Sequence, residues 1–278
     1  KDIKARSSIG HTRWATHGGV NDQNAHPHAA PERGLSMVHN GIIENANELR
    51  DFLSSKGHKF ESETDSECFL RLMLFHLDEG LDIKDAVIQS FKKIKGHSAF
   101  VILYKETDEI YAIKNGAPLV CGINDINSEA FVSSDPYALA GMANKIYFPE
   151  NEVLCHLSPS NQNILNFYEL NGEKSKRYTA KAQNMDHDPA AKGDYEHYML
   201  KEIFEQPELI RSLTQFYFKG EGKDSLLKAL SLPRKNVHIT ACGTAFYAGM
   251  VIKDFIEKEN RIPCKLEIAS EFRYRNPV

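Results

Sequence analysis

Apolar residues recur every three or four positions in three stretches of the first third of the chain, which predicts three amphipathic helices. The first covers residues 44–56, the second begins with Asp65 as its N-cap, and the third covers residues 83–95. Gly57 and Gly96 follow the first and third stretches, where a glycine commonly ends a helix.

Short apolar or alternating runs separated by turn residues predict strands. One run, residues 35–39, stops at the Asn40-Gly41 pair, which predicts a turn. Seven more runs follow the third helix, at residues 98–104, 109–114, 118–122, 130–134, 145–148, 152–156 and 164–170. The gaps between runs are short, so the pattern favours antiparallel pairing. Helices segregated from strands favour an α+β layered domain.

The last third of the chain has a different pattern. Residues 184–194 are polar and aperiodic, which is typical of a linker, and residues 195–218 predict a helix that Pro207 restarts rather than lies inside. A buried strand, a glycine turn, a helix and a second strand follow, at residues 236–240, 241–244, 245–259 and 265–269. This βαβ order predicts a parallel α/β sheet. We therefore expect a first domain over 1–185, a linker over 186–194 and a second domain over 195–278.

Composition excludes several classes of protein. The 278 residues suit two domains, and the net charge of 34 − 38 = −4 argues against a general nucleic-acid binder. Apolar runs are far shorter than the roughly 20 residues that a membrane span needs. The five cysteines form no C-x-x-C pair, which predicts reduced thiols and a cytoplasmic location. They are Cys68, Cys121, Cys155, Cys242 and Cys264.

The segment from Gly10 to Gly18 concentrates ligand-binding chemistry. Arg13 offers a planar fork that can hold a carboxylate, and Trp14 offers a large flat wall. Flanking glycines let backbone N–H groups approach a ligand closely. The alternative is a solvent-exposed turn in which Trp14 only fills space.

Histidines crowd the same part of the chain and raise a metal site as a rival. They are His11, His17, His26, His28 and His39. Zinc ligands need recognisable spacings, which are missing here, and an extended chain would place the rings of His26 and His28 on opposite sides. We expect no metal and no cofactor, and histidines that hold loops by hydrogen bonds.

Two further groups complete a possible site. Asn40 and Gly41, adjacent at a strand end, would make a two-donor oxyanion hole, although a plain Asn-Gly turn is the alternative. Residues 63–65 could hold a cationic amine, although an ordinary N-cap at Asp65 is the alternative. Together with Arg13 these groups could bind the amine, the carboxylate and the developing amide oxyanion of one free glutamine.

At this point the sequence resembles a known family. Its blocks are similar to those of the glutamine–fructose-6-phosphate aminotransferases (isomerizing), or glucosamine-6-phosphate synthases, which carry a class II glutamine amidotransferase domain. The first block alone indicates class II glutamine amidotransferases broadly, and the last three blocks single out this family. They are residues 11–18, 24–28, 38–45, 62–65, 195–207, 241–244 and 267–275.

The resemblance implies an N-terminal-nucleophile hydrolase-type layered domain and a role for each matching residue. Arg13 would bind the glutamine carboxylate, and Asp65 the amino group. Thr16 and His17 would complete the pocket, Trp14 would close over it, and Asn40 with Gly41 would form the oxyanion hole. The family's nucleophile is an N-terminal Cys, for which this chain has no position. We expect a chain cut at both ends and inactive by itself.

The second domain resembles the start of a sugar isomerase (SIS) domain. Cys242, Gly243 and Thr244 would bind a sugar phosphate at a helix N-terminus, although a small-residue packing turn is the alternative. Ala245 stands where many members have Ser, and Cys242 is expected to be buried. The resemblance implies conversion of fructose-6-phosphate and glutamine to glucosamine-6-phosphate and glutamate, by a homodimer. A sugar-phosphate sensor and another class II amidotransferase remain alternatives.

Overall fold

The computed structural model describes residues 5–13, 18–159, 163–182, 192–231, 235–272 and 274–275. The chain folds as two compact units, Lys1–Ala191 and Lys192–Val278. Among the described residues, no helix has the length and apolar character needed to cross a membrane.

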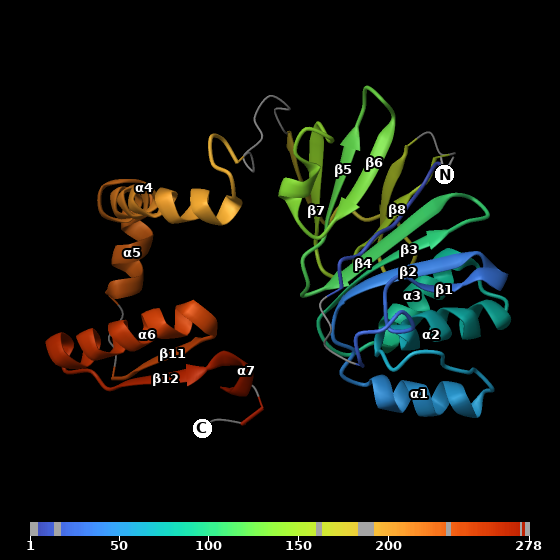
Figure 1. Ribbon diagram of the computed structural model, residues 1–278, viewed down its shortest axis with the longest axis horizontal. Helices are drawn as coiled ribbons and strands as arrows, with labels where there is room; N and C mark the ends of the chain where they lie inside the picture. The colour runs from blue at the N-terminus through green and yellow to red at the C-terminus, as the bar shows by residue number, and fades with distance from the viewer. Residues whose placement is uncertain are drawn as a thin grey trace. The chain divides into compact units, whose positions relative to one another are not determined.

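The first unit contains the three predicted helices, followed mainly by strands (Figure 1). The helices are α1 (Ala46–Ser55), α2 (Ser66–Asp78) and α3 (Ile83–Lys93), with 3₁₀ turns η1 (Pro31–Arg33) and η2 (Pro136–Leu139). The strands are β1 (His28–Ala30), β2 (Leu35–Gly41), β3 (Ser98–Tyr104), β4 (Glu109–Asn115), β5 (Val120–Asn124), β6 (Glu129–Ser133), β7 (Lys145–Pro149), β8 (Leu154–Leu157), β9 (Leu165–Tyr168) and β10 (Tyr178–Ala182). The sequence pattern did not predict β1 or β10.

These strands form two antiparallel sheets within the described residues. One has the order β1-β2-β3-β4-β8-β9, and the other has the order β10-β7-β5-β6. Each pairing inside them is antiparallel. The predicted α+β layered arrangement with antiparallel sheets is therefore confirmed.

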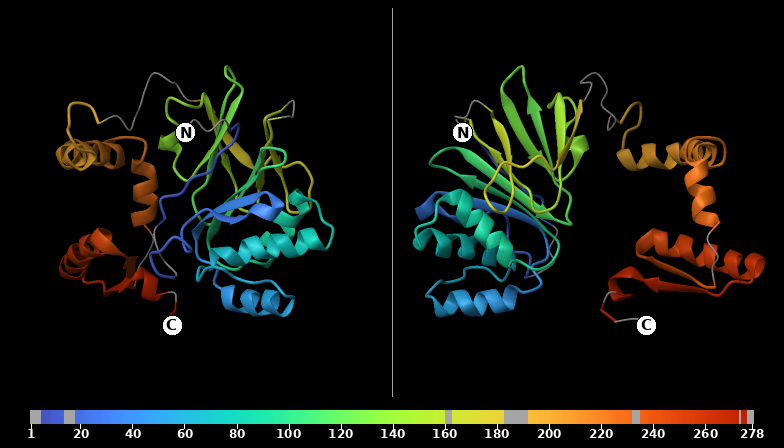
Figure 2. Two further views of the ribbon diagram at one scale, coloured as in Figure 1. Left: turned by 45° about the vertical axis from the view of Figure 1, so that its right-hand side comes forward. Right: turned by 180° about the vertical axis from the view of Figure 1, so that it is seen from behind.

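Alternating side chains of the first sheet produce the layers of this unit. Phe100 and Ile102 of β3 point into a core shared with α1, α2 and α3. Ala99, which directly precedes Phe100 in β3, belongs to a second core that also contains Cys121 of β5. Successive strand residues face opposite sides, so one sheet serves both cores. Figure 2 shows the helices on one side of the first sheet and the second sheet on the other.

The predicted turn at Asn40-Gly41 is wrong. Both residues end strand β2, where Asn40 lies opposite Ala99 and Gly41 lies opposite Ser98 of β3. Gly41 has a φ of 127°, which a glycine adopts readily, so the strand continues through the pair instead of reversing.

The second unit contains the predicted strand–helix–strand succession. Strands β11 (Val237–Ala241) and β12 (Cys264–Ile268) pair in parallel, which confirms the βαβ prediction. The remaining elements are α4 (Tyr198–Lys219), α5 (Lys223–Leu230), α6 (Gly243–Phe255), the π-helical turn η3 (Ile256–Asn260) and α7 (Ala269–Phe272). Gly249 of α6 lies so close to β12 that a Cβ there would be 2.8 Å from Leu266 Cδ1.

Two predictions for the secondary structure and burial of these elements are wrong. Pro207 lies inside α4 and does not restart it. Proline has no backbone N–H to donate, yet this 22-residue helix runs without a break on both sides of Pro207. Strand β11 is only partly buried: its residues alternate between half-buried and exposed, and α6 packs against it while β12 pairs along its edge.

Candidate functional site

At the end of strand β2, successive backbone N–H groups point to opposite edges of the strand. The Ile42 N–H donates to the His97 carbonyl oxygen, 3.0 Å away. Residues of an antiparallel pair alternate between hydrogen-bonded and non-hydrogen-bonded positions, so the preceding pair, Gly41 and Ser98, is of the second kind. The Gly41 N–H is therefore directed away from β3.

Its neighbours along the same edge of β2 are already engaged. The His39 N–H donates to His26 Nδ1 at 3.1 Å, and the Ile43 N–H donates to Asp65 Oδ2 at 2.7 Å. The N–H of Gly41 lies between these two contacts, and β1 pairs only with residues 35–37 of β2. A Cβ at position 41 would collide with the His97 carbonyl oxygen, so only glycine fits there.

The Asn40 side chain is exposed beside this edge and is held by a histidine. His11 Nε2 lies 2.8 Å from Asn40 Oδ1, and the Arg13 backbone N–H donates to His11 Nδ1 at 2.9 Å. The Arg13 guanidinium in turn donates to the Gly19 carbonyl oxygen at 3.1 Å. Arg13, His11 and Asn40 thus form one connected chain of hydrogen bonds.

Asp65 lies on the other side of the Gly41 N–H. Its side chain is buried, and its carboxylate accepts the Ile43 N–H instead of capping α2. Asp65 stands at the predicted N-cap position of α2, but its side chain makes no capping hydrogen bond and its dihedral angles are helical (φ −65°, ψ −30°). Burial lowers the pKa of His28, while Arg13 lowers and Asp65 raises it through their charges. The charges of Arg13 and Asp65, the two proposed glutamine-binding residues, therefore both act on the His28 ring.

Two acidic residues hold the loops that carry these charges. Glu63 accepts the Gly19 N–H at 3.2 Å and the Asn24 side-chain N–H at 3.1 Å, and the Asn24 bond is the main cause of its lowered pKa. Glu67 accepts the Ser62 N–H at 2.7 Å and pairs with Arg71. Burial raises the pKa of Glu67, but its hydrogen bonds together lower it below the usual value.

The histidines beside the site form a column of rings. His11 and His26 stack with centroids 4.4 Å apart, and His26 and His28 lie 4.8 Å apart. The expectation that the last two rings point to opposite sides is wrong, because turns precede His26 and the chain is not extended there. Burial, followed by the charge of His11, lowers the pKa of His26 to about 3.

Comparisons with known proteins identify the family that this chain is similar to. Residues 11–141 match the family model described as a glutamine amidotransferase domain. The chain is 40% identical to glutamine–fructose-6-phosphate aminotransferase [isomerizing] of Clostridium acetobutylicum over 99% of its own length and 45% of that protein. The chain carries a class II glutamine amidotransferase domain.

Other relatives and one solved structure extend the comparison. The proteins of the same name from Thermotoga maritima and Aquifex aeolicus are 38% and 40% identical over 97% and 99% of the chain. The chain spans 44% and 45% of their lengths. Glutamine phosphoribosylpyrophosphate amidotransferase from B. subtilis is 17% identical, with a TM-score of 0.50 over 96% of this chain and 56% of that chain. That likeness shows the fold of an N-terminal-nucleophile amidotransferase.

Within the amidotransferase domain, Trp14, Thr16 and His17 lie outside the described residues. Sequence reasoning did not find the roles of His11, Asn24 and Glu63. His11 stands two positions before Arg13, but its partner Asn40 is 29 positions away, and no local pattern reveals such a contact.

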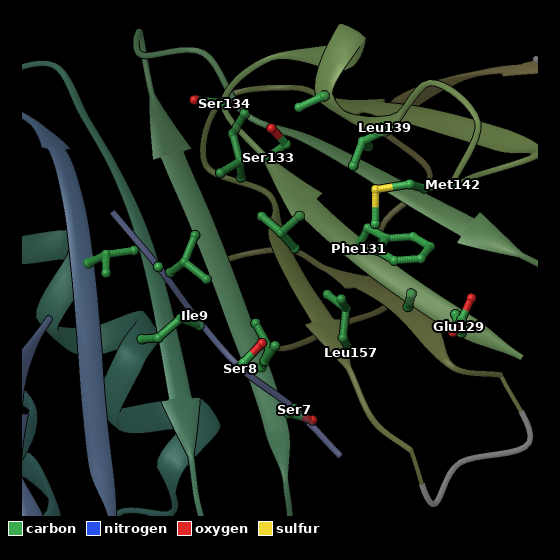
Figure 3. Close-up of a pocket in the computed structure, with 18 of the residues that line it drawn as sticks. Ser7, Ser8, Ile9, Glu129, Phe131, Ser133, Ser134, Leu139, Met142 and Leu157 are labelled. Carbon is green, nitrogen blue, oxygen red and sulfur yellow. The ribbon is translucent and has the colours of Figure 1, made fainter. Parts of the chain in front are cut away.

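A cavity of about 690 Å³ lies between the two sheets of the amidotransferase domain. Figure 3 shows Ser7, Ser8 and Ile9 along one side of it and Phe131 and Met142 along the other. Of the described site residues, His11 and Asn40 line this cavity, whereas Arg13, Gly41 and Asp65 do not. We therefore do not assign glutamine to it.

The three buried cysteines of this domain are poorly suited to nucleophilic attack. Burial raises the pKa of Cys68 to about 11 and also raises the pKa of Cys155, while Cys121 lies in the core between the sheets. A thiolate is the attacking form, so a raised pKa disfavours attack at neutral pH.

In the second unit, Cys242, Gly243 and Thr244 stand at the start of α6 and are exposed. The expectation that Cys242 is buried is wrong. It precedes α6 at the end of β11, where the backbone N–H of Ser270 is the main cause of a lowered thiol pKa. Gly243 has a φ of 58°, and a Cβ there would meet nothing within 4 Å.

Proposed function

We propose that the first unit binds glutamine and releases its amide nitrogen, and that the full-length protein transfers this nitrogen to fructose-6-phosphate to form glucosamine-6-phosphate. The observation that carries the proposal is the pairing of the His11-held Asn40 amide with the outward Gly41 N–H. Two such donors beside one another stabilise the oxyanion that forms when an amide carbonyl is attacked.

The charges around this edge suit a free amino acid. The Arg13 guanidinium provides a cation for the α-carboxylate, and the buried Asp65 carboxylate provides an anion for the α-amino group. Arg13 is connected to Asn40 through His11, and Asp65 holds the backbone N–H two positions beyond Gly41. Trp14, Thr16 and His17 complete the glutamine pocket in this proposal.

The attacking thiol in this proposal is an N-terminal cysteine, whose own amino group acts as the base, as the family resemblance implies. Cys68, Cys121 and Cys155 are buried, and the remaining two cysteines belong to the second unit. We therefore expect no glutamate release by the 278-residue chain alone, measured against a blank without protein.

The second unit is proposed to begin a SIS domain, with Cys242, Gly243 and Thr244 at a sugar phosphate. The parallel βαβ unit, the exposed N-terminus of the 13-residue helix α6 and the names of the relatives support this proposal. Backbone N–H groups at a helix N-terminus suit a phosphate. A homodimer and a cytoplasmic location stay predictions.

Asn40→Ala in the full-length protein tests the glutaminase proposal. The oxyanion exists only after attack, so we expect kcat for glutamate release to fall on the order of 10²–10³-fold with little change in KM. Asn127→Ala, at an exposed loop of the same unit, is the matched control and should leave both constants unchanged. A change confined to KM would show that Asn40 only binds substrate or shapes the strand end.

A further inference from the structure

We propose that His11 is a positioning residue of the oxyanion hole: it fixes the orientation of the Asn40 amide, so that the two Nδ2 hydrogens remain available to the glutamine oxygen. This inference deepens the proposed function and rests on it. His11 itself need not touch glutamine.

The tautomer of His11 follows from its contacts. The Arg13 backbone N–H can only donate, and it lies 2.9 Å from His11 Nδ1, so Nδ1 carries a lone pair. A neutral imidazole with an unprotonated Nδ1 carries its hydrogen on Nε2. That nitrogen lies 2.8 Å from Asn40 Oδ1, a carbonyl oxygen that can only accept.

The orientation of the Asn40 amide follows in turn. The opposite orientation would place the Nδ2 hydrogens against the Nε2 hydrogen of His11, with two donors facing each other. With Oδ1 engaged by His11, the Nδ2 group is directed elsewhere. An oxyanion hole needs donors preorganised before the charge develops, and His11 supplies this preorganisation for the side-chain donor.

The His11 ring is itself held in place. It stacks on His26 with centroids 4.4 Å apart and planes inclined by 21°. His26 Nδ1 accepts the His39 N–H, so the stack is tied to the residue that immediately precedes Asn40 in β2. Burial lowers the pKa of His26 to about 3, which keeps this ring uncharged beneath His11 at neutral pH.

The same geometry connects substrate binding with the oxyanion hole. The N–H that sets the His11 tautomer belongs to Arg13, which has a φ of 33°. The guanidinium of Arg13 is anchored to Gly19, which Glu63 holds in turn. The segment that carries the proposed carboxylate-binding residue thereby also orients Asn40.

Two variants of the full-length protein separate this role from a merely structural one. In His11→Gln the side-chain amide nitrogen reaches the place of Nε2, whereas in His11→Asn it reaches only the place of Nδ1. We expect His11→Asn to lower kcat for glutamate release on the order of 10- to 100-fold with KM little changed. His11→Gln should recover most of that loss.

A double variant tests the connection with Asn40. Because His11 acts through Asn40, adding His11→Asn to Asn40→Ala should produce almost no further fall in kcat. Equal losses in His11→Gln and His11→Asn, a change in KM alone, or multiplicative losses in the double variant would each overturn the inference.

A direct measurement does not depend on activity. In the 278-residue chain with ¹⁵N-labelled histidine, His11 should show the Nε2–H tautomer, with an unprotonated Nδ1, at neutral pH. The Nδ1–H tautomer would overturn the inference even if His11→Asn failed to fold. Full-length wild-type protein without glutamate release would instead contradict the proposed function, and an active full-length enzyme with an insensitive His11 would contradict this inference alone.

Discussion

The two units differ most in how they bury apolar side chains. In the first unit, one sheet separates two cores, and residues such as Phe69, Phe100 and Met37 are fully enclosed. In the second unit, Cys264 is the one hydrophobic residue of the described part that is buried. Large apolar residues of α4 and α6, such as Phe204 and Phe255, are more than half exposed there.

This difference shows that an apolar residue in the sequence does not imply a buried side chain to the same degree in the two units. An apolar residue in a sheet with covered faces has a partner in this chain, so its position determines stability and site geometry. On one side of α6, by contrast, the apolar residues are exposed, and no described residue of the second unit covers them. Stability and candidate chemistry are therefore expected to respond to substitution mainly in the first unit.

The largest expected effect compares two phenylalanines. Phe100 is fully buried and stacks on Phe69 with centroids 3.9 Å apart, whereas Phe255 is 62% exposed. Phe100→Ala should lower the free energy of unfolding by about 3–5 kcal/mol, because it leaves a cavity. Phe255→Ala should change it by less than about 0.5 kcal/mol.

Urea unfolding followed by circular dichroism measures both changes. Similar losses in the two variants would contradict the comparison, because they would mean that α6 is packed as tightly as the first core.

Two glycines with positive φ provide a second comparison. Gly41→Ala forces a methyl group against the His97 carbonyl oxygen at a φ of 127°. We expect a loss of about 3 kcal/mol, from the backbone and the collision together. Gly243→Ala, at a φ of 58° with nothing within 4 Å, should lose only about 1 kcal/mol. Thermal and urea unfolding give the two values, and equal losses would show that β2 relaxes to accept a side chain.

The fold of the first unit was largely predictable from local pattern. The run at residues 98–104 became β3 with the same bounds, because a strand whose two faces are both covered appears as a short continuous apolar run. Helix bounds were less accurate, and α3 ends at Lys93 instead of residue 95. Strand β10 was missed, since its residues are mostly exposed and carry little apolar signal.

The site was only partly predictable, because its contacts are long-range. The residue types of Arg13, Asn40 and Asp65 indicated glutamine chemistry, but their assignment as site residues stays a prediction. Local rules failed where tertiary contacts replaced local ones: Asp65 holds Ile43 instead of capping α2, and Asn40-Gly41 pairs with β3 instead of turning. The hydrogen bond from His11 to Asn40 has no local signal at all.

The smallest expected effect is on the pH dependence of stability, and it compares a histidine of the first unit with one of the second. The pKa of His26 falls to about 3 from the ordinary 6.5, mainly through burial and then through His11. Below pH 6.5 the unfolded chain therefore binds a proton that the folded chain does not. Stability should fall as the pH is lowered from 6.5 towards 3 and should be fully retained above 6.5. The other groups that act on this ring are His28, His39 and Arg13.

His26→Gln should remove this part of the pH dependence. At pH 5 the contribution is at most about 2 kcal/mol, and solvent screening of the half-buried ring reduces it further. Urea unfolding at pH 7.5 and pH 5 gives the difference, with His238→Gln on exposed β11 as the matched control. If wild type and His26→Gln lost equal stability on acidification, His26 would bind its proton equally well in the folded and the unfolded chain. A protonated Nδ1 cannot accept the His39 N–H, so this outcome would contradict a neutral ring beneath His11.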